Sequence, residues 1–330
     1  MMKAMVIRSF GSSDLFEEIA LPIPSLEKGQ VLVKISATSI NPVDIKIRSG
    51  IYGALAPGFP AILQGDFSGI IESVAEGVFE FKQGDAVYGC AGGIIGNNGA
   101  LAEYVAIDFR FIARVPSLLS MRQAAALPLV SITAFSALID GLNLKSSDKV
   151  LIHAGAGGVG HIAIQIAKHL GAKVYSTVSC LEKSEVITRL GADPIFYKTE
   201  TVKDYVDRCT QGKGFDVVFD TVGGQALDDS LSAAAYQGRV ATIQGASKHD
   251  LAPLFKKELL LKGVFMLGPI LNGQNRERHG QILNQIAVWV SQNKLLPIVD
   301  EHFFTLTDIS EAHRYFETGK HIGKVVIEIK

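Results

Sequence analysis

The chain has 330 residues, of which 48% are hydrophobic and 20% charged, and its formal net charge is −1. These proportions are typical of a well-packed globular enzyme rather than a disordered chain, and the length predicts about two domains. A charge so close to zero and the lack of any run of eighteen apolar residues argue against a nucleic-acid partner and against a membrane span.

The first residues have neither the apolar core of a signal peptide nor the composition of a transit peptide, so we expect a cytoplasmic protein. Three cysteines, Cys90, Cys180 and Cys209, are widely spaced and odd in number, which argues against a disulfide framework. The eight histidines form no HExxH motif. We therefore predict no metal site.

Residues 1–122 are expected to form a β-rich domain, because short apolar stretches alternate with clusters of Gly, Pro and Asn. Strands are predicted around 31–35, 69–74 and 104–107, and residues 92–99 have the composition of a loop. The character changes at Met121. Short helices are predicted there, at 123–127 and 133–138.

From residue 150 onward, strands and helices alternate strictly. Strands are predicted at 150–154, 173–178, 194–197, 216–220 and 239–243, and helices at 158–170, 182–190, 201–211 and 226–234. Because the strands are almost wholly apolar and the alternation is regular, we predict a parallel, doubly wound sheet.

The last part of the chain leaves this pattern. A long amphipathic helix is predicted at 281–292, a strand near 302–305, a helix at 308–317 and a final strand at 324–329. A final strand needs a partner, and the β-rich N-terminal part provides one. We therefore predict an α/β protein in which a Rossmann-type domain, residues 123–267, is inserted into a β-rich domain made of residues 1–122 and 268–330.

The most informative motif lies between a predicted strand and a predicted helix. Gly155, Gly157 and Gly160 fit the pattern GxGxxG, in the strand-to-helix context that gives this pattern its meaning. Gly155 permits a tight turn, Gly157 lets the backbone approach a pyrophosphate, and Gly160 lets helix and strand pack closely. The N-terminus of the helix would stabilise the anion. We predict a dinucleotide site.

The end of the second predicted strand indicates which dinucleotide binds. NAD sites usually carry an acidic residue there to hold the ribose 2′-hydroxyl. This strand instead ends in Ser179 and Cys180, and Lys183 follows, so a hydroxyl and a cation are available for a 2′-phosphate. Glu182 complicates the interpretation, and a solvated helix lysine is the alternative for Lys183. We predict NADPH.

Several stretches, in matching order over the whole chain, resemble the zinc-independent, zeta-crystallin-like quinone oxidoreductase branch of the medium-chain dehydrogenase/reductase superfamily. They are INPVDIKIRSGIYG (40–53), GDFSGIIESVAEGV (65–78), GDAVYG (84–89), ALPLVSITAFSAL (126–138), HAGAGGVGHIAIQIAK (153–168), LGAD (190–193), FDTVGG (219–224) and HIGKVVI (321–327). The resemblance implies a GroES-like substrate domain and a Rossmann domain.

Three departures from the zinc alcohol dehydrogenases of this superfamily agree with each other. Asn41 stands where those enzymes carry Cys, Gly65 stands where they carry His, and the short loop 92–99 replaces their four-cysteine lobe. The resemblance therefore implies an enzyme that works without zinc.

The resemblance also assigns residues to roles. Asn41 and Tyr52 match polar positions beside the quinone, where they would stabilise negative charge on the carbonyl oxygen. Asp44 and Asp66 are also expected in the cleft, but an aspartate there can simply fix a loop. The residues that it places around NADPH, together with those of the glycine motif, are Thr133, Gly155, Gly157, Gly158, Val159, Gly160, Ser179, Lys183, Tyr197, Val222, Gly245, Phe265, Met266, Leu267 and Lys324.

The implied activity is hydride transfer from NADPH to a small quinone or enone, with a small molecule as the partner. No general acid is identified. Two alternatives stay open: an enoyl reductase acting on thioesters, and a non-catalytic NADPH-binding protein. The apolar run at 259–267 is predicted to form an edge strand through which two copies pair as a homodimer.

Overall fold

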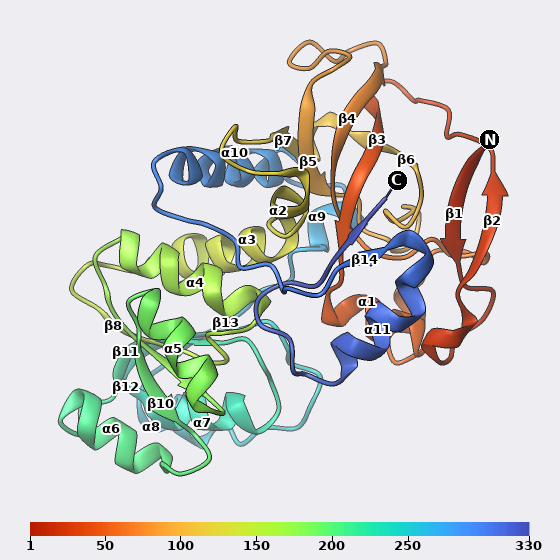
Figure 1. Cartoon of the computed structure of the whole chain (residues 1–330). Coiled ribbons are helices and arrows are strands. Elements are labelled where there is room, and N and C mark those ends of the chain that lie inside the picture. Colours follow the sequence, from red (N-terminus) through yellow and green to blue (C-terminus); the bar gives the residue numbers. More distant parts are fainter. Residues whose placement is uncertain (330) are drawn as a thin grey trace. The chain divides into compact units, whose positions relative to one another are not determined.

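The structure is a computed structural model that describes residues 1–329, so only Lys330 of the predicted segment 268–330 lies outside the described residues. Contacts divide the chain into two compact units (Figure 1). Unit 1 comprises Met1–Leu129 and Leu267–Lys330, and unit 2 comprises Val130–Met266. The inserted domain was predicted to comprise residues 123–267, and unit 2 begins seven residues later and ends one residue earlier. The roles of the two domains stay a prediction.

Unit 2 is built on a parallel sheet of six strands within residues 1–329, in the order β10-β9-β8-β11-β12-β13. The strands are β8 (Lys149–Ile152), β9 (Lys173–Val178), β10 (Asp193–Phe196), β11 (Phe215–Asp220), β12 (Ala234–Thr242) and β13 (Leu260–Gly263). Strand order reverses between β8 and β11. In such sheets, ligands bind at the carboxyl ends of the strands beside this reversal.

Helices cover both faces of this sheet. They are α4 (Gly158–His169), α5 (Leu181–Arg189), α6 (Val202–Thr210), α7 (Gln225–Ala233) and α8 (Ala252–Lys256), and α3 (Pro128–Phe135) leads into the unit through the π-helical turn Ser136–Gly141. Right-handed crossovers in opposite directions place α4 and α5 on one face and α6 and α7 on the other. This is the doubly wound α/β arrangement that the sequence predicts.

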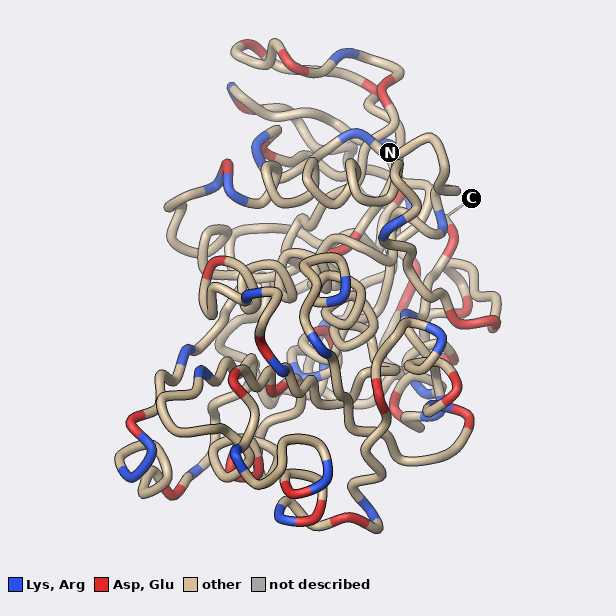
Figure 2. The backbone as a smooth tube through the Cα atoms, turned by 90° about the vertical axis from the view of Figure 1, so that its left-hand side faces the viewer, with Lys and Arg blue, Asp and Glu red and all other residues tan. Residues whose placement is uncertain are grey.

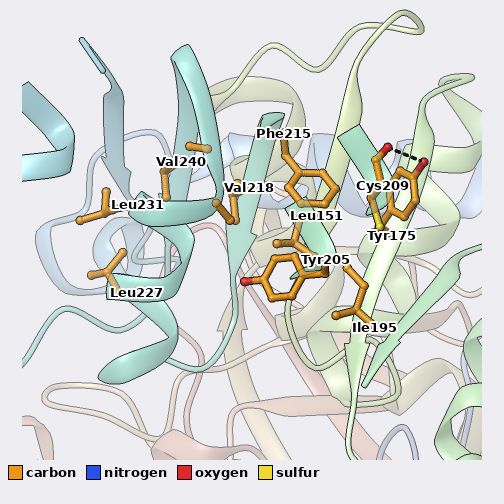
Figure 3. Close-up of a cluster of buried hydrophobic side chains, with 12 residues drawn as sticks. Leu151, Tyr175, Ile195, Tyr205, Cys209, Phe215, Val218, Leu227, Leu231 and Val240 are labelled. Carbon is orange, nitrogen blue, oxygen red and sulfur yellow. Dashed lines mark hydrogen bonds between the residues drawn. The ribbon is translucent and has the colours of Figure 1, made fainter. Parts of the chain in front are cut away.

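The apolar core beneath α6 and α7 is shown in Figure 3. Phe215 of β11 is fully buried, and its ring packs edge-on against Tyr175 at 5.4 Å. Tyr205 of α6 also lies near this ring, tilted against it with ring centroids 6.3 Å apart. The Tyr175 hydroxyl donates to the backbone oxygen of Cys209 at 3.3 Å, so the one polar atom that this tyrosine brings into the core has an acceptor.

Within residues 1–329, unit 1 has a mostly antiparallel sheet of seven strands and a separate two-stranded sheet of β1 and β2, with helices around them. Its strands are β1 (Met2–Val6), β2 (Glu17–Leu21), β3 (Gln30–Ser39), β4 (Asp66–Val74), β5 (Ala86–Cys90), β6 (Tyr104–Asp108), β7 (Ile112–Arg114), β14 (Phe304–Thr305) and β15 (Val326–Glu328). Strand β3 pairs with β4, β6 and β15. The final strand therefore pairs with the N-terminal sheet, which confirms that expectation.

The helices of unit 1 are α1 (Pro42–Arg48), α2 (Met121–Ala125), α9 (Gly268–Asn272), α10 (Glu277–Ser291) and α11 (Ile309–Glu317), with short 3-10 turns at Ser13–Leu15, Gly53–Leu55, Phe109–Phe111 and Leu306–Asp308. Helix α1 begins directly after β3, with Pro42 in its first turn and Asn41 as its N-cap. The β3–α1 junction thus places Thr38, Ser39 and Asn41 within four residues of each other.

Among the predicted element boundaries that differ from the structure, three are instructive. Helix α10 begins at Glu277 rather than 281 and so includes Gly280. The missing side chain of Gly280 leaves room for Arg110, whose backbone oxygen would lie 2.7 Å from an added Cβ. Strand β12 begins at Ala234 rather than 239, and Gln237, with φ +57°, interrupts its alternation. Helix α3 begins at Pro128 rather than 133, in a stretch too uniformly apolar to mark a start.

None of the helices formed by residues 1–329 is long and apolar enough to cross a bilayer. Cys90, Cys180 and Cys209 are free thiols. In the view of Figure 2, basic and acidic residues are interspersed along the chain rather than gathered by sign, as the net charge of −1 suggests.

Candidate functional site: a glycine-rich cofactor edge and a buried polar cluster

The three motif glycines of unit 2 are required for different reasons. A Cβ added to Gly155 would lie 2.2 Å from Ser176 Oγ, and one added to Gly160 would lie 2.2 Å from Ala154 O. Both positions must be glycine for packing alone. A Cβ on Gly157 would find only Ala154 O, at 3.2 Å, and the φ of Gly157 is −84°. Packing restricts Gly157 less than the other two positions, and a glycine here leaves room for the close approach of a ligand.

The N-terminus of α4 offers donors beside this glycine. The structure shows no acceptor within residues 1–329 for the backbone N–H groups of Gly158, Val159 and Gly160. Helix α4 has twelve residues, so its dipole and these N–H groups favour an anion at this end. The predicted pyrophosphate residues are therefore together, and the cradle suits a dinucleotide.

The loops that follow β11 and β12 form the next part of this edge. The Asp220 carboxylate is fully buried; Oδ1 accepts from the N–H groups of Val222 and Gly223, each at 2.9 Å, and Oδ2 accepts from Thr242 Oγ1 at 2.7 Å. Asp220 thus fixes the loop that presents Val222, which is half exposed. Gly245 follows β12, and an added Cβ there would meet nothing within 4 Å.

The ends of β9 and β10 bring the predicted 2′-phosphate residues close to each other. Parallel pairing sets Val178 opposite Phe196, so Ser179 and Tyr197 directly follow neighbouring strand ends. Lys183 lies in the first turn of α5 and is half-buried, whereas Glu182 is exposed. Lys198 is also exposed here and is a further cation that sequence reasoning missed, although it directly follows Tyr197.

The remaining predicted cofactor residues differ in burial. Thr133 in α3 is 3% exposed. Phe265 follows β13 and is half exposed, whereas Met266 and Leu267 are buried, Leu267 as the first residue of the second segment of unit 1. His153 was missed: it immediately precedes the glycine loop, its Nδ1 lies 3.4 Å from Thr177 Oγ1, and burial lowers its pKa.

Asp66 is the centre of a buried polar cluster in unit 1. Its Oδ2 accepts from Ser39 Oγ at 2.8 Å, from Asn41 Nδ2 at 2.9 Å and from Lys324 Nζ at 3.1 Å. Its Oδ1 accepts from the backbone N–H of Leu129 at 2.7 Å. The carboxylate is fully buried and is satisfied by four donors, as a buried charge must be.

Lys324 brings the compensating positive charge. It is 2% exposed, and its ammonium also donates to Ile40 O at 2.9 Å and to Asn41 Oδ1 at 2.5 Å. These acceptors and Asp66 match the three N–H donors of an ammonium. The proposed contact of Lys324 with the cofactor stays a prediction; what the structure shows is that its charge holds the Asn41 amide.

Burial raises the pKa of two further groups in this cluster. Burial is the largest cause that raises the pKa of Asp44 to about 7; the nearby Asp66 carboxylate adds to it, while the Asn41 N–H, at 2.7 Å from Oδ2, opposes it. Burial, followed by the Asp66 carboxylate, raises the pKa of Cys90 well above its ordinary value. Cys90 is therefore an inert thiol rather than a nucleophile or a metal ligand.

Tyr52, the second predicted substrate-side residue, lies beyond the end of α1 and is half-buried. The ammonium of Lys46 lies over its ring, 5.1 Å from the centroid. Asn41 and Tyr52 are thus placed at opposite ends of α1. Lys46 is a cation beside Tyr52 that sequence reasoning did not single out, although it lies in the same NPVDIK stretch.

The residues around Asp66 do not suit a metal ion. A Cβ at Gly65 would lie 2.8 Å from Cys90 Sγ, so a histidine at that position has no room without a shift. A divalent cation on the oxygens of Asn41 and Asp66 would face the Lys324 ammonium, which already binds both. No group of three His, Cys, Asp or Glu side chains arranged for a metal occurs in the part of the chain that the structure describes.

Comparison with known proteins is consistent across the chain. Residues 27–117 match the family described as alcohol dehydrogenase GroES-like domain, and residues 190–327 match the family described as zinc-binding dehydrogenase. The chain is 33% identical to 2-methylene-furan-3-one reductase of Solanum lycopersicum and 31% identical to NADPH-dependent alkenal/one oxidoreductase, chloroplastic, of Arabidopsis thaliana. Both alignments cover 99% of this chain and 79% of the relative.

A solved structure of Escherichia coli quinone oxidoreductase complexed with NADPH superimposes on the chain with a TM-score of 0.87 at 27% identity. The superposition covers 99% of each chain. The similarity therefore extends over both units, and the fold class that the sequence predicts is confirmed.

The motif glycines give a paired prediction. Gly157→Ala should fold normally but raise the dissociation constant for NADPH by about tenfold or more, because its methyl group would lie where the phosphate approaches. Gly160→Ala should lower the free energy of unfolding by about 1–3 kcal/mol, because its methyl group would overlap the Ala154 carbonyl. Fluorescence titration and urea unfolding measure the two effects, and normal NADPH binding by Gly157→Ala would contradict the assignment.

A second prediction concerns Asp44. Its pKa is about 7 in the folded chain and 3.8 by default, so between these values the folded state holds a proton that the unfolded state has released. Raising the pH across this interval therefore lowers the free energy of unfolding, by up to about 4 kcal/mol. Asp44→Asn lacks this titration, so its stability relative to wild type should rise between pH 4 and 8. Urea unfolding at both pH values tests this, and parallel curves would refute it.

Proposed function

Because the chain belongs to the zinc-independent quinone oxidoreductase branch of the medium-chain dehydrogenase/reductase superfamily, we propose that it transfers a hydride from NADPH to a small quinone or enone. The observation that carries this proposal is the joint presence of the α4 cradle, which suits a dinucleotide, and similarity over 99% of this chain to an NADPH-dependent alkenal/one oxidoreductase. Unit 2 is the cofactor domain in this proposal, and unit 1 is the substrate domain.

Different residues of unit 2 would bind different parts of the cofactor. The N–H groups of Gly158, Val159 and Gly160 would bind the pyrophosphate at the start of α4. Ser179, Lys183 and Tyr197 would hold the 2′-phosphate at the ends of β9 and β10. Thr133, Val222, Gly245 and residues 265–267 would surround the nicotinamide and its ribose. The loop fixed by Asp220 gives Val222 a rigid support.

NADPH supplies the hydride, and the protein has to stabilise the negative charge that develops on the carbonyl oxygen of the substrate. Asn41 suits this role because its amide is held in one orientation: Lys324 binds Oδ1, and Asp66 accepts from Nδ2. The cation on Oδ1 polarises the amide and makes its N–H hydrogens better donors. The Tyr52 hydroxyl is the second donor in the proposal.

No metal takes part in this proposal, because the Lys324 ammonium already provides the positive charge at Asn41 and Asp66. Activity should therefore survive prolonged treatment with a strong chelator. Loss of activity on chelation that zinc restores would count against this part of the proposal.

We further propose a cytoplasmic homodimer. Strand β13 is the edge of the sheet in unit 2, and Leu260 and Phe265 beside it are each more than half exposed. An apolar edge with free backbone groups favours pairing with its copy about a two-fold axis. Three free thiols suit a reducing compartment. Light scattering at micromolar concentration tests the dimer, and a monomer would contradict it.

The direct test of the function is NADPH oxidation measured with a panel of quinones, 2-alkenals and acyl thioesters. We expect turnover with quinones or 2-alkenals. Turnover with thioesters alone would assign the chain to enoyl reduction instead, and binding of NADPH without turnover of any substrate would make it a non-catalytic binding protein.

Lys183→Ala tests the choice of cofactor. If Lys183 binds the 2′-phosphate, its loss should raise the NADPH KM by about tenfold or more, since a charge-assisted hydrogen bond contributes about 1.5–3 kcal/mol. The NADH KM should hardly change, because NADH has no such phosphate. Steady-state kinetics with both cofactors measures this.

Two matched variants serve as controls for that measurement. Glu182→Ala should tighten NADPH binding, because it removes a like charge. Lys173→Ala, at the amino end of β9 and paired with Asp193, should have no effect on either cofactor. Equal weakening of NADPH and NADH by Lys183→Ala would show that the phosphate pocket lies elsewhere.

A further inference from the structure

Three side chains of unit 2 that have no part in the proposed reduction form a hydrogen-bonded chain. Ser247 Oγ lies 2.7 Å from His249 Nε2, and His249 Nδ1 lies 3.0 Å from Asp228 Oδ1. Ser247 and His249 belong to the loop between β12 and α8, and Asp228 lies in the first turn of α7. Figure 1 shows α7 and α8 next to each other at the lower end of this unit.

The two distances fix the tautomer of His249. A carboxylate only accepts hydrogen bonds, so Nδ1 must carry the proton that points at Asp228. In the neutral ring Nε2 then has a lone pair, which accepts from the Ser247 hydroxyl. This is the arrangement in which a histidine serves as a general base for a serine nucleophile, with the carboxylate orienting the ring.

The three side chains of this hydrogen-bonded chain differ in burial, and the histidine is the most buried of them. The His249 side chain is 9% exposed and that of Asp228 is 32% exposed, so the ion pair that would form is partly shielded. Ser247 is exposed and can meet a solute. The structure assigns no acceptor within residues 1–329 to the backbone N–H groups of Ala246, Ser247 and Lys248. These N–H groups are unused donors in the same loop as Ser247, of the kind that an oxyanion needs.

We propose that Ser247, His249 and Asp228 form a nucleophilic triad that hydrolyses short-chain carboxylic esters with good leaving groups, an activity separate from hydride transfer. Ser247 Oγ attacks the acyl carbon while its proton passes to His249 Nε2, and Asp228 stabilises the imidazolium. The bond from the acyl carbon to the alkoxy oxygen then breaks, and His249 returns the proton to the departing alcohol. Water repeats the sequence on the acyl-serine and releases the carboxylic acid.

A second histidine of the chain provides an internal comparison. His302 Nδ1 lies 2.8 Å from Asp300 Oδ1, in the same pairing with a carboxylate, and its side chain is 57% exposed. No hydroxyl group bonded to its Nε2 is found in the described part of the chain. His302 is therefore a control: it shows how fast an exposed His–Asp pair hydrolyses an activated ester when no serine hydroxyl is bonded to the ring.

The test is hydrolysis of 4-nitrophenyl acetate by the full chain without NADPH, together with labelling by a fluorophosphonate probe and mapping of the labelled peptide. We expect a single label on Ser247. Ser247→Ala and His249→Gln should each lower kcat/KM for the ester at least about tenfold, and Asp228→Asn should lower it as well. His302→Gln should leave it unchanged. Thermal unfolding midpoints show whether each variant is folded.

Two outcomes would overturn the proposal. One is wild-type protein that takes no label and hydrolyses the ester no faster than free imidazole at the same concentration. The other is hydrolysis that persists in Ser247→Ala or is lost in His302→Gln, which would trace the reaction to exposed imidazole groups. Neither outcome bears on hydride transfer, which the NADPH oxidation assay measures separately.

Discussion

The buried pair of Asp66 and Lys324 is the interaction on which the polar side of unit 1 depends. Charges with 0% and 2% exposure are stable in a protein interior only when each is paired and its remaining hydrogen-bonding positions are satisfied. The pair meets this condition by recruiting Ser39 and Asn41, so β3, α1, β4 and the last part of the chain are held at one point. The orientation of the Asn41 amide is a by-product of that requirement.

The glycine loop shows how a motif combines two kinds of constraint. Gly155 and Gly160 are determined by contacts within the protein, and they would be glycine even in a protein of this fold that bound nothing. An added Cβ would meet nothing within 4 Å at Gly245, and at Gly157 it would meet one atom, the Ala154 oxygen, at 3.2 Å. A motif match alone therefore overstates the evidence for a ligand, whereas these two less restricted glycines together with the free donors of α4 support it directly.

Much of the fold could be predicted from the sequence, because hydrophobic periodicity and turn residues are local. The alternation in unit 2 and the return of the final strand to the N-terminal sheet follow from such patterns, and the limits of α10 were missed where Gly280 serves a distant contact. The glycine loop was found because its spacing is local as well. The cluster around Asp66 was not found from the sequence. Its two charged residues, Asp66 and Lys324, are 258 residues apart, and no local pattern near either one shows that they form a pair. The Ser247–His249–Asp228 chain was missed for the same reason, because Asp228 lies 21 residues before His249.

The pairing of β15 with β3 has a consequence for the order in which the chain acquires its structure during synthesis. Unit 2 is one continuous segment, so all its strands exist once residue 266 has been added. Unit 1 begins first but finishes last: β3 lacks one neighbour, and the Asp66 carboxylate lacks its cation, until residues 324–328 emerge. The first segment of unit 1 therefore waits, with an incomplete sheet and an unneutralised carboxylate, while the ribosome makes some 200 further residues at roughly 5–20 per second. A nascent chain of this architecture exposes an open strand edge for tens of seconds, which is the interval in which a chaperone has the most to protect.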